Sequence, residues 1–233
     1  MTRRINALLV VLTLIAGSAL AQDERPKMIP APDRGADEGE GPFSRLIIRG
    51  AILIDGTGAP PIGPVDIVIE NNVIVDVDSV GYPGLEIEEG DRPTDATREI
   101  DAHGQYVMPG IIDMHTHTGG STKAPEAEYT YKLWMGHGIT AVRGVPSGAV
   151  DFSLSEKARS ANNQIVAPRI FSYHRPGSGD EWDDRKILTA DDAREWVRYI
   201  ADEGADGLKL GSYRPVIMEA LLDESRKLGL GST

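Results

Sequence analysis

Two histidines separated by one residue are the feature of this sequence most suited to chemistry: His115 and His117 flank Thr116. They close a short apolar stretch at 111–115 that is typical of a strand. Side chains two apart on a strand point the same way, so both imidazoles can face one point at the strand's C-terminal end. Neutral imidazoles are natural ligands for Zn²⁺ and similar divalent ions. The spacing therefore predicts a metal site, with a polar strand end as the alternative.

Two further candidates lie at or just after the ends of predicted strands: Arg143 and His174. Arg143 either binds a substrate carboxylate or pairs with Asp113 as structural support. His174 could touch substrate at the rim of the same face, but we favour a loop histidine without a ligand role.

Composition excludes several classes of function. The chain has 233 residues, 26% of them charged and 40% hydrophobic, which is ordinary globular material. Asp and Glu (36) outnumber Lys and Arg (24), giving a net charge of −12. Such an acidic surface repels phosphate backbones, so we expect no nucleic-acid partner. The absence of cysteine excludes disulfides, thiolate metal sites and cysteine nucleophiles.

The N-terminus predicts export. A basic start at 1–4 precedes an apolar run at 7–16, and Ala19-Leu20-Ala21 supplies the small residues that a signal peptidase needs. The run is short for a bilayer of about 30 Å. We therefore expect residues 1–21 to be a signal peptide, leaving a periplasmic or secreted protein without membrane contact. An uncleaved anchor is the alternative.

The next two regions differ in pattern. Residues 22–45 are rich in proline, glycine and charge and lack apolar periodicity, which predicts a solvated linker. Residues 46–108 contain short β-branched runs separated by turn residues, which predicts a small sheet or a β-sandwich segment. We predict one hairpin around residues 71–72 and a second around residues 103–104.

Residues 109–233 alternate strand and helix patterns, which indicates an α/β fold with parallel strands. We count about four β/α units and the start of a fifth strand at Leu230. This is about half the ~250 residues of a (β/α)₈ TIM barrel, so we expect a partial barrel and an incomplete sequence. The predicted strands are 111–115, 139–143, 169–173 and 207–210, and the predicted helices are 124–137, 151–162, 189–203 and 215–228.

The sequence around the two histidines, from Tyr106 to His117, resembles the amidohydrolase superfamily of metal-dependent hydrolases. It looks most like the branch that contains imidazolonepropionase-like and Xaa-Pro dipeptidase-like members. The resemblance covers nearly all of the mature chain and implies an N-terminal β-sandwich segment followed by a barrel. Further matching segments are 53–58, 67–74, 138–143 and 204–210.

The resemblance assigns roles residue by residue. His115 and His117 match the family's first two metal ligands. Lys209 matches the strand-four lysine that is carboxylated in binuclear members and bridges their two metals, with a strand-end lysine that reaches solvent as the alternative. The expected cofactor is therefore one or two divalent ions, with Zn²⁺ as the expected metal. The family's later histidine ligands and its catalytic strand-eight Asp have no positions here, so the catalytic residue is unknown. Gly144 also stands where relatives often carry Asp.

The implied function is metal-dependent hydrolysis of a carbon–nitrogen bond. A metal ion that lowers the pKa of water to ~7 supplies hydroxide near neutral pH. The expected substrate is a cyclic amide, another non-peptide amide or a dipeptide, and a mononuclear deaminase is less favoured because of Lys209. We expect the 233-residue chain alone to bind Zn²⁺ weakly and to be inactive. The alternative is a secreted, non-catalytic module that binds a partner, and the oligomeric state stays open.

Overall fold

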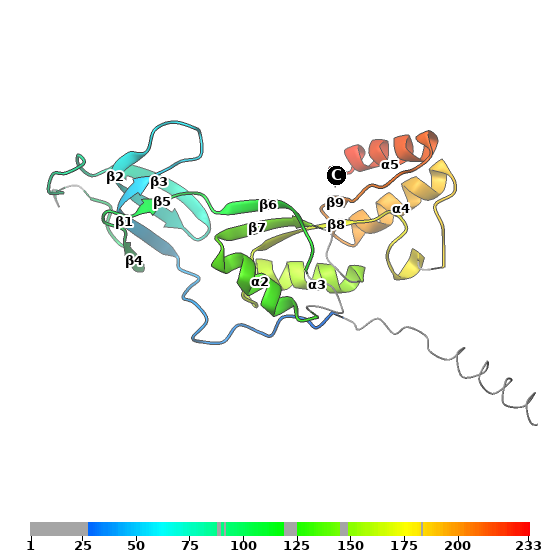
Figure 1. The fold of residues 1–233 in the computed structure, drawn as a ribbon, viewed down its shortest axis with the longest axis horizontal. Helices are drawn as coiled ribbons and strands as arrows, with labels where there is room; N and C mark the ends of the chain where they lie inside the picture. The colour runs from blue at the N-terminus through cyan, green and yellow to red at the C-terminus, as the bar shows by residue number, and fades with distance from the viewer. Residues whose placement is uncertain (1–27, 88–89, 91, 119–124, 145–148, 183) are drawn as a thin grey trace, which may run out of the picture.

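The chain folds into two sheets that follow one another along the long axis of the molecule (Figure 1). The computed structural model describes residues 28–87, 90, 92–118, 125–144, 149–182 and 184–233. The predicted signal peptide and the first part of the predicted linker lie outside these residues. Within the described part, no helix is both long enough and apolar enough to cross a bilayer.

The first sheet has five strands in the order β3-β2-β1-β4, and β5 also pairs with β1. Its strands are β1 (Arg45–Leu53), β2 (Ile62–Glu70), β3 (Val73–Ser79), β4 (Arg98–Asp101) and β5 (Tyr106–Val107). β2 and β3 form the hairpin predicted around residues 71–72. Asn71 adopts φ +55°, a left-handed conformation that asparagine tolerates better than most residues.

The second predicted hairpin is wrong. β4 and β5 do not pair with each other; both run parallel to β1 along one of its edges. Between them the chain makes a turn, in which the Gln105 amide donates to the Ala102 carbonyl. The interruption faces a register shift in β1 at Gly50, which has φ +67°. The residues around 103–104 therefore connect two short strands that both run along β1, and they do not reverse the chain.

The second sheet is entirely parallel, in the order β10-β9-β8-β7-β6. Its strands are β6 (Ile111–Thr116), β7 (Ile139–Gly144), β8 (Arg169–His174), β9 (Gly207–Leu208) and β10 (Gly231–Ser232). The helices between them are α2 (Ala127–Gly136), α3 (Val150–Ala161), α4 (Ala190–Asp202) and α5 (Pro215–Lys227), with a 3₁₀ turn at Asp180–Trp182. Four β/α units and a fifth strand confirm the α/β, partial-barrel prediction.

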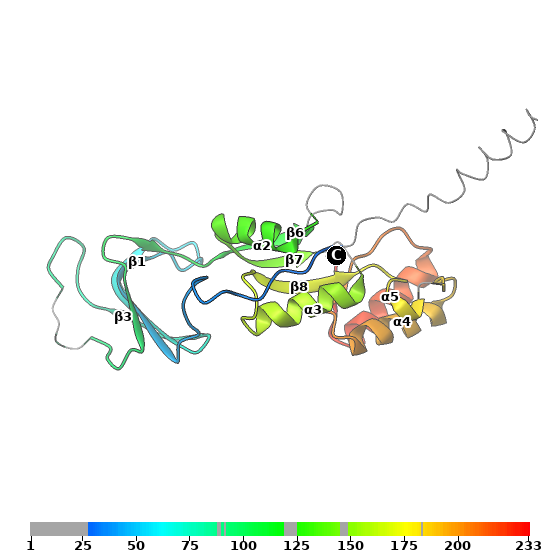
Figure 2. The same cartoon turned by 90° about the horizontal axis from the view of Figure 1, so that it is seen from below.

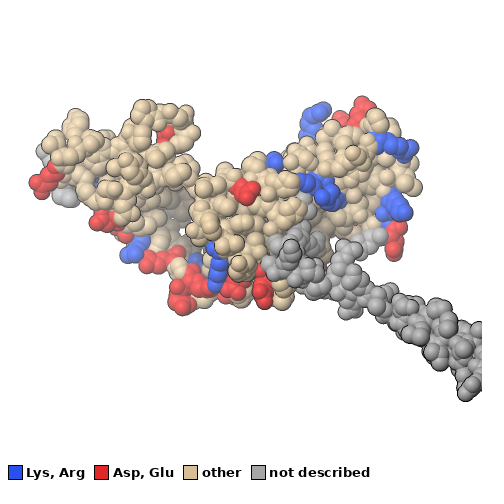
Figure 3. Space-filling model, in the orientation of Figure 1, with Lys and Arg blue, Asp and Glu red and all other residues tan. Residues whose placement is uncertain are grey.

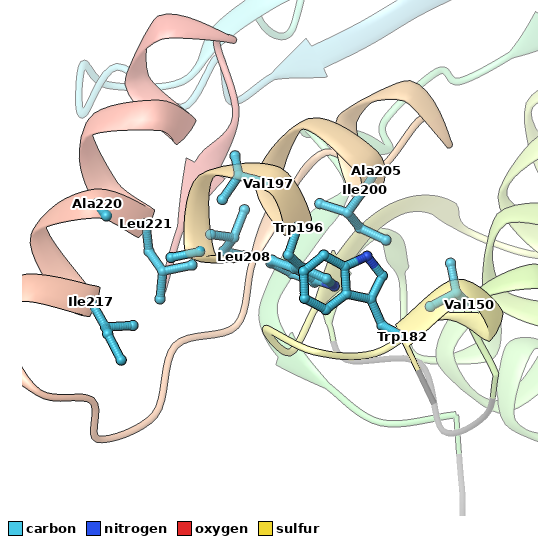
Figure 4. Close-up of a cluster of buried hydrophobic side chains, with 11 residues drawn as sticks. Val150, Trp182, Trp196, Val197, Ile200, Ala205, Leu208, Ile217, Ala220 and Leu221 are labelled. Carbon is cyan, nitrogen blue, oxygen red and sulfur yellow. The ribbon is translucent and has the colours of Figure 1, made fainter. Parts of the chain in front are cut away.

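The helices cover one face of this sheet, which fixes the direction of every strand side chain. From α2 and β7, Tyr131 and Val142 share one apolar cluster with Ile170 of β8, while Leu208 of β9 packs with Trp196 of α4 in another. Figure 4 shows the second cluster between α4, α5 and β9. α2 and α3 lie together along the first three strands (Figure 2). The opposite face, which we call the inner face, takes the alternate residues of each strand.

Helix α4 follows local sequence signals closely. The Thr189 hydroxyl accepts from the Asp192 amide at 3.1 Å, and the Asp192 carboxylate accepts from the Thr189 amide at 2.9 Å. This reciprocal capping box satisfies two amides that the helix itself leaves without partners. The helix then buries four residues on one side, which lie in the second cluster: Ala193, Trp196, Val197 and Ile200.

The described end of the predicted linker differs from a solvated tether. Ala31 is only 3% exposed, and its amide donates to the buried Glu156 carboxylate of α3 at 3.1 Å. Ile29 pairs in a parallel bridge with Glu126, just before α2. Glu156 also accepts from Arg159 at 2.6 Å. The composition did not reveal this docking because it depends on one buried carboxylate that lies 125 residues further along the chain.

Candidate metal site

Three of the predicted site residues meet on the inner face. The Lys209 Nζ lies 3.0 Å from the His115 Nε2. The rings of His115 and His117 have their centroids 5.4 Å apart and are inclined by 39°. His115 is the second-to-last residue of β6, and Lys209 directly follows β9. Both therefore lie at the carboxyl ends of parallel strands. Active sites of barrels form at this end.

The strand pattern explains why Lys209 reaches the histidines. Leu208 is completely buried beneath the helices, so the next residue along the chain points to the inner face. The Lys209 amide donates to the His174 carbonyl at 2.8 Å, which continues the β8–β9 pairing beyond the end of β9. The backbone is thus fixed where the lysine side chain leaves the sheet.

The electrostatics favour a neutral imidazole. Burial lowers the pKa of His117, and the nearby His115, Lys209 and Arg175 lower it further. A neutral imidazole carries the lone pair that a metal ion needs, because protonation would block it. Over the whole molecule acidic residues dominate, but Lys and Arg side chains are prominent over the C-terminal half (Figure 3).

These residues fit part of a metal shell. His115 and His117 supply two imidazoles on one side of a strand end, and Lys209 can supply oxygen atoms only after carboxylation. Among the described residues, no group of three or more His, Cys, Asp or Glu could hold a metal ion. Catalytic zinc sites normally have three protein ligands. The described chain thus brings together a partial donor set.

Arg143 lies on the inner face but contacts neither Asp113 nor the histidine rings in the described structure. Its Nε donates to the Met114 carbonyl at 3.1 Å, and its Nη2 donates to the Thr233 hydroxyl at 3.0 Å. Its guanidinium carbon also lies 5.2 Å from the centre of the Tyr173 ring. Of the two alternatives for Arg143, the ion pair with Asp113 does not occur in the described structure, and Arg143 instead contacts the backbone of β6.

His174 does not join the site. It is the last residue of β8 instead of a loop residue, it is 5% exposed, and its Nε2 lies 2.8 Å from the Ser172 Oγ. Ser172 in turn faces Ser153 of α3 at 3.3 Å, so this side chain points towards the helices. Burial lowers the pKa of His174 to about 4. A buried, neutral histidine on the helix side cannot touch a substrate at the inner face.

The residue that sequence reasoning missed is Tyr173. It precedes His174, so strand alternation places it on the inner face, where it stacks with Arg143. The alternation was visible in the sequence, but the face that turns towards the helices was not. The burial of Ile170 and Ser172, four and two residues before His174, settles this choice.

The geometry defines a partial α/β barrel in which two histidines and a lysine meet at the carboxyl ends of the strands. No protein-family profile matches the chain. The adenine deaminase of Methanoculleus marisnigri is 40% identical over 78 residues, which are 30% of this chain and 15% of that protein. The D-hydantoinase of Rhizobium radiobacter is 30% identical over 107 residues, covering 43% of this chain and 23% of that protein.

A solved structure supports the fold over a longer range. The crystal structure of a Xaa-Pro dipeptidase with bound methionine in the active site aligns with a TM-score of 0.57 and 22% identity. The alignment covers 81% of this chain and 56% of that one. Together these partial matches place the chain in the amidohydrolase superfamily. The chain spans less than a quarter of the two curated relatives and about half of the solved structure.

Proposed function

We propose that this chain supplies part of the metal site of a hydrolase that acts on a carbon–nitrogen bond in a small molecule, namely a cyclic amide, another non-peptide amide or a dipeptide. The observation that carries the proposal is the meeting of His115, His117 and Lys209 at the strand ends of the inner face. The names of the relatives, D-hydantoinase and Xaa-Pro dipeptidase, support this range of substrates.

Each residue has a defined task in this proposal. His115 and His117 bind a divalent ion, with Zn²⁺ the first choice for imidazole donors. The Lys209 ammonium would lose one proton, and the free amine would add to CO₂ and release a second proton to form a carbamate, whose oxygens would serve as further metal donors. When bound, the metal supplies Lewis acidity and hydroxide near neutral pH. Arg143 and Tyr173 form part of the inner-face surface next to these residues.

The first test is metal binding by the 233-residue chain. Calorimetric titration with Zn²⁺ should show weak binding, with a further loss of at least about tenfold in His115→Ala and in His117→Ala. His137→Ala is the matched control, because His137 is exposed at the end of α2, where its Nδ1 lies 2.8 Å from the Leu133 carbonyl. Unchanged binding in His115→Ala would contradict the proposal and favour a non-catalytic binding module.

The second test concerns the number of metals and the substrate. A longer chain that carries the remaining barrel strands should hydrolyse a hydantoin, another amide or a dipeptide in the presence of a divalent metal. A ratio near two metals per chain supports the bridging role of Lys209, whereas a ratio near one counts against it. Loss of the second metal in Lys209→Ala, with the first retained, would assign the bridge to this residue.

We also propose that the protein is exported, on the basis of residues 1–21 alone. Mass spectrometry of protein recovered from the periplasm or the medium should then find Gln22 at the N-terminus. Retention of Met1 on membrane-bound protein would contradict export with cleavage.

A further inference from the structure

The strand that carries the histidines is irregular directly before them. β6 and β7 pair in parallel, with Asp113 opposite Val142 and Thr116 opposite Gly144. Between these two pairs, β6 advances by three residues while β7 advances by two. One extra residue in one strand is a β-bulge, and bulges next to active sites re-aim side chains.

The extra residue changes which face each side chain takes. Thr116 is 6% exposed and lies opposite Gly144, on the helix side of the sheet. Its neighbours His115 and His117 consequently point to the inner face, where Lys209 contacts the first of them. Asp113 lies opposite Val142, which is also buried on the helix side. In a regular strand His115 would share the face of Asp113, so the bulge is what turns it inward.

One side chain holds the bulge from within β6. The His115 amide donates to the Asp113 Oδ1 at 3.0 Å. This is the local bond in which aspartate accepts from the backbone two residues further on. It competes with regular ladder pairing and so favours an irregular backbone at this point.

A second side chain holds the bulge from the neighbouring strand. Arg143 of β7 donates through its Nε to the carbonyl of Met114, the residue between the two partners of the first bond. The guanidinium is fixed by the Tyr173 ring and the Thr233 hydroxyl. Both the amide and the carbonyl within the bulge thus have side-chain partners.

We propose that Asp113 and Arg143 are positioning residues for the metal site, because they hold the bulge in β6 that turns His115 to the inner face. The inference rests on the proposed metal site but concerns residues that do not bind the metal. It also gives Arg143 a task other than capture of a substrate carboxylate, since its Nε and Nη2 already donate within the protein.

The chain offers a matched control for the aspartate. In the first sheet the His103 amide donates to the Asp101 Oδ1, also at 3.0 Å, in the same aspartate-x-histidine arrangement. Asp101→Ala removes the same kind of bond far along the chain from the site. Asp113→Ala and Asp101→Ala should therefore have similar effects on stability, and only the former should affect the metal.

The experiment titrates the full 233-residue chain with Co²⁺ and records both the affinity and the visible absorption of the bound ion. Asp113→Ala should weaken binding by about tenfold to a hundredfold. Asp113→Asn keeps the accepting Oδ1 and should stay within about threefold of the wild type. Arg143→Met, which loses the donors but keeps much of the length, should weaken binding by about tenfold and change the absorption spectrum.

The outcomes separate this inference from the proposed function. If the wild type and His117→Ala bind Co²⁺ equally, the metal site itself is wrong and both proposals fall. If His117→Ala loses binding but Asp113→Ala and Arg143→Met match the wild type, only the positioning role falls. An equal loss of affinity in Asp101→Ala and Asp113→Ala would also overturn it, because the effect would then be one of general stability. Unfolding curves of every variant confirm that each is folded.

Discussion

The two sheets differ in whether their charged side chains have partners of opposite charge. In the first sheet Asp66 is fully buried, and its carboxylate accepts from Arg49 at 2.8 Å, from the Gly50 amide at 2.9 Å and from Arg92 at 2.9 Å. At the inner face of the second sheet, the side chains of His115, His117 and Lys209 gather without a hydrogen bond or ion pair to any acidic side chain in the described part of the chain.

The difference separates a structural cluster from a site that can take a ligand. Burial alone would raise the pKa of Asp66, but the bonds from Arg92, Gly50 and Arg49 outweigh it and hold the pKa below its ordinary value. The charge of Asp66 is thus fully compensated within the chain. Imidazole nitrogens that are not engaged by carboxylates keep their lone pairs available for a ligand such as a metal ion.

The largest expected effect comes from breaking the compensated cluster. Asp66→Ala leaves Arg49 and Arg92 with only 16% and 12% of their side-chain surface exposed and without their shared partner. Removal of one member of a buried ion pair typically costs about 3–5 kcal/mol. Urea denaturation should show this loss. Asp55→Ala, at an exposed carboxylate, is the control and should cost less than half as much.

The next effect tests the helix side of the second sheet, where a buried carboxylate is also compensated. Glu156 is 1% exposed and accepts from the Ala31 amide and from Arg159. Glu156→Ala should cost about 1–3 kcal/mol. The loss is smaller than for Asp66 because Arg159 keeps its ion pair with Asp33. Limited proteolysis should also cut around residues 28–34 faster than in the exposed-site control Glu128→Ala.

A pH-dependent effect distinguishes buried from exposed histidines. Burial holds the pKa of His174 at about 4, below its ordinary 6.5, so the unfolded chain takes up a proton at a pH where the folded chain does not. The free energy of unfolding should therefore fall by up to about 3 kcal/mol as the pH drops from 6.5 to 4. Denaturation curves of His174→Gln should lack this part of the fall. His137→Gln should keep it.

The smallest expected effect on stability concerns Lys209, in the inner-face site of the second sheet. Lys209→Met removes a charge that pairs with no acidic side chain among the described residues, so the free energy of unfolding should change by less than about 1 kcal/mol. Because Lys209 helps to lower the pKa of His117, that pKa should rise in the variant. NMR titration of the His117 ring in the metal-free chain measures this. Lys186→Met, at an exposed lysine, should leave the His117 titration unchanged.

Much of the fold follows from local sequence. The helix predicted at 189–203 is observed at Ala190–Asp202, because the Thr189 cap, the apolar stripe and Gly204 mark its ends and its buried side. The helix predicted at 215–228 is observed at Pro215–Lys227 for similar reasons. The pairing of β4 and β5 could not be predicted in the same way. Both of them pair with β1, which lies about fifty residues earlier in the chain.

The sequence by itself determined the parallel α/β pattern and the residues that could bind a metal, because periodicity, capping and the His-x-His spacing are properties of neighbouring residues. Tertiary structure decided which side chains meet. Tyr173 lies on the inner face and His174 on the helix side, and only the packing of α3 tells which face of β8 is covered. Likewise, the inward turn of His115 depends on Arg143, 28 residues further along the chain, whose donor reaches β6 only when the two strands lie side by side.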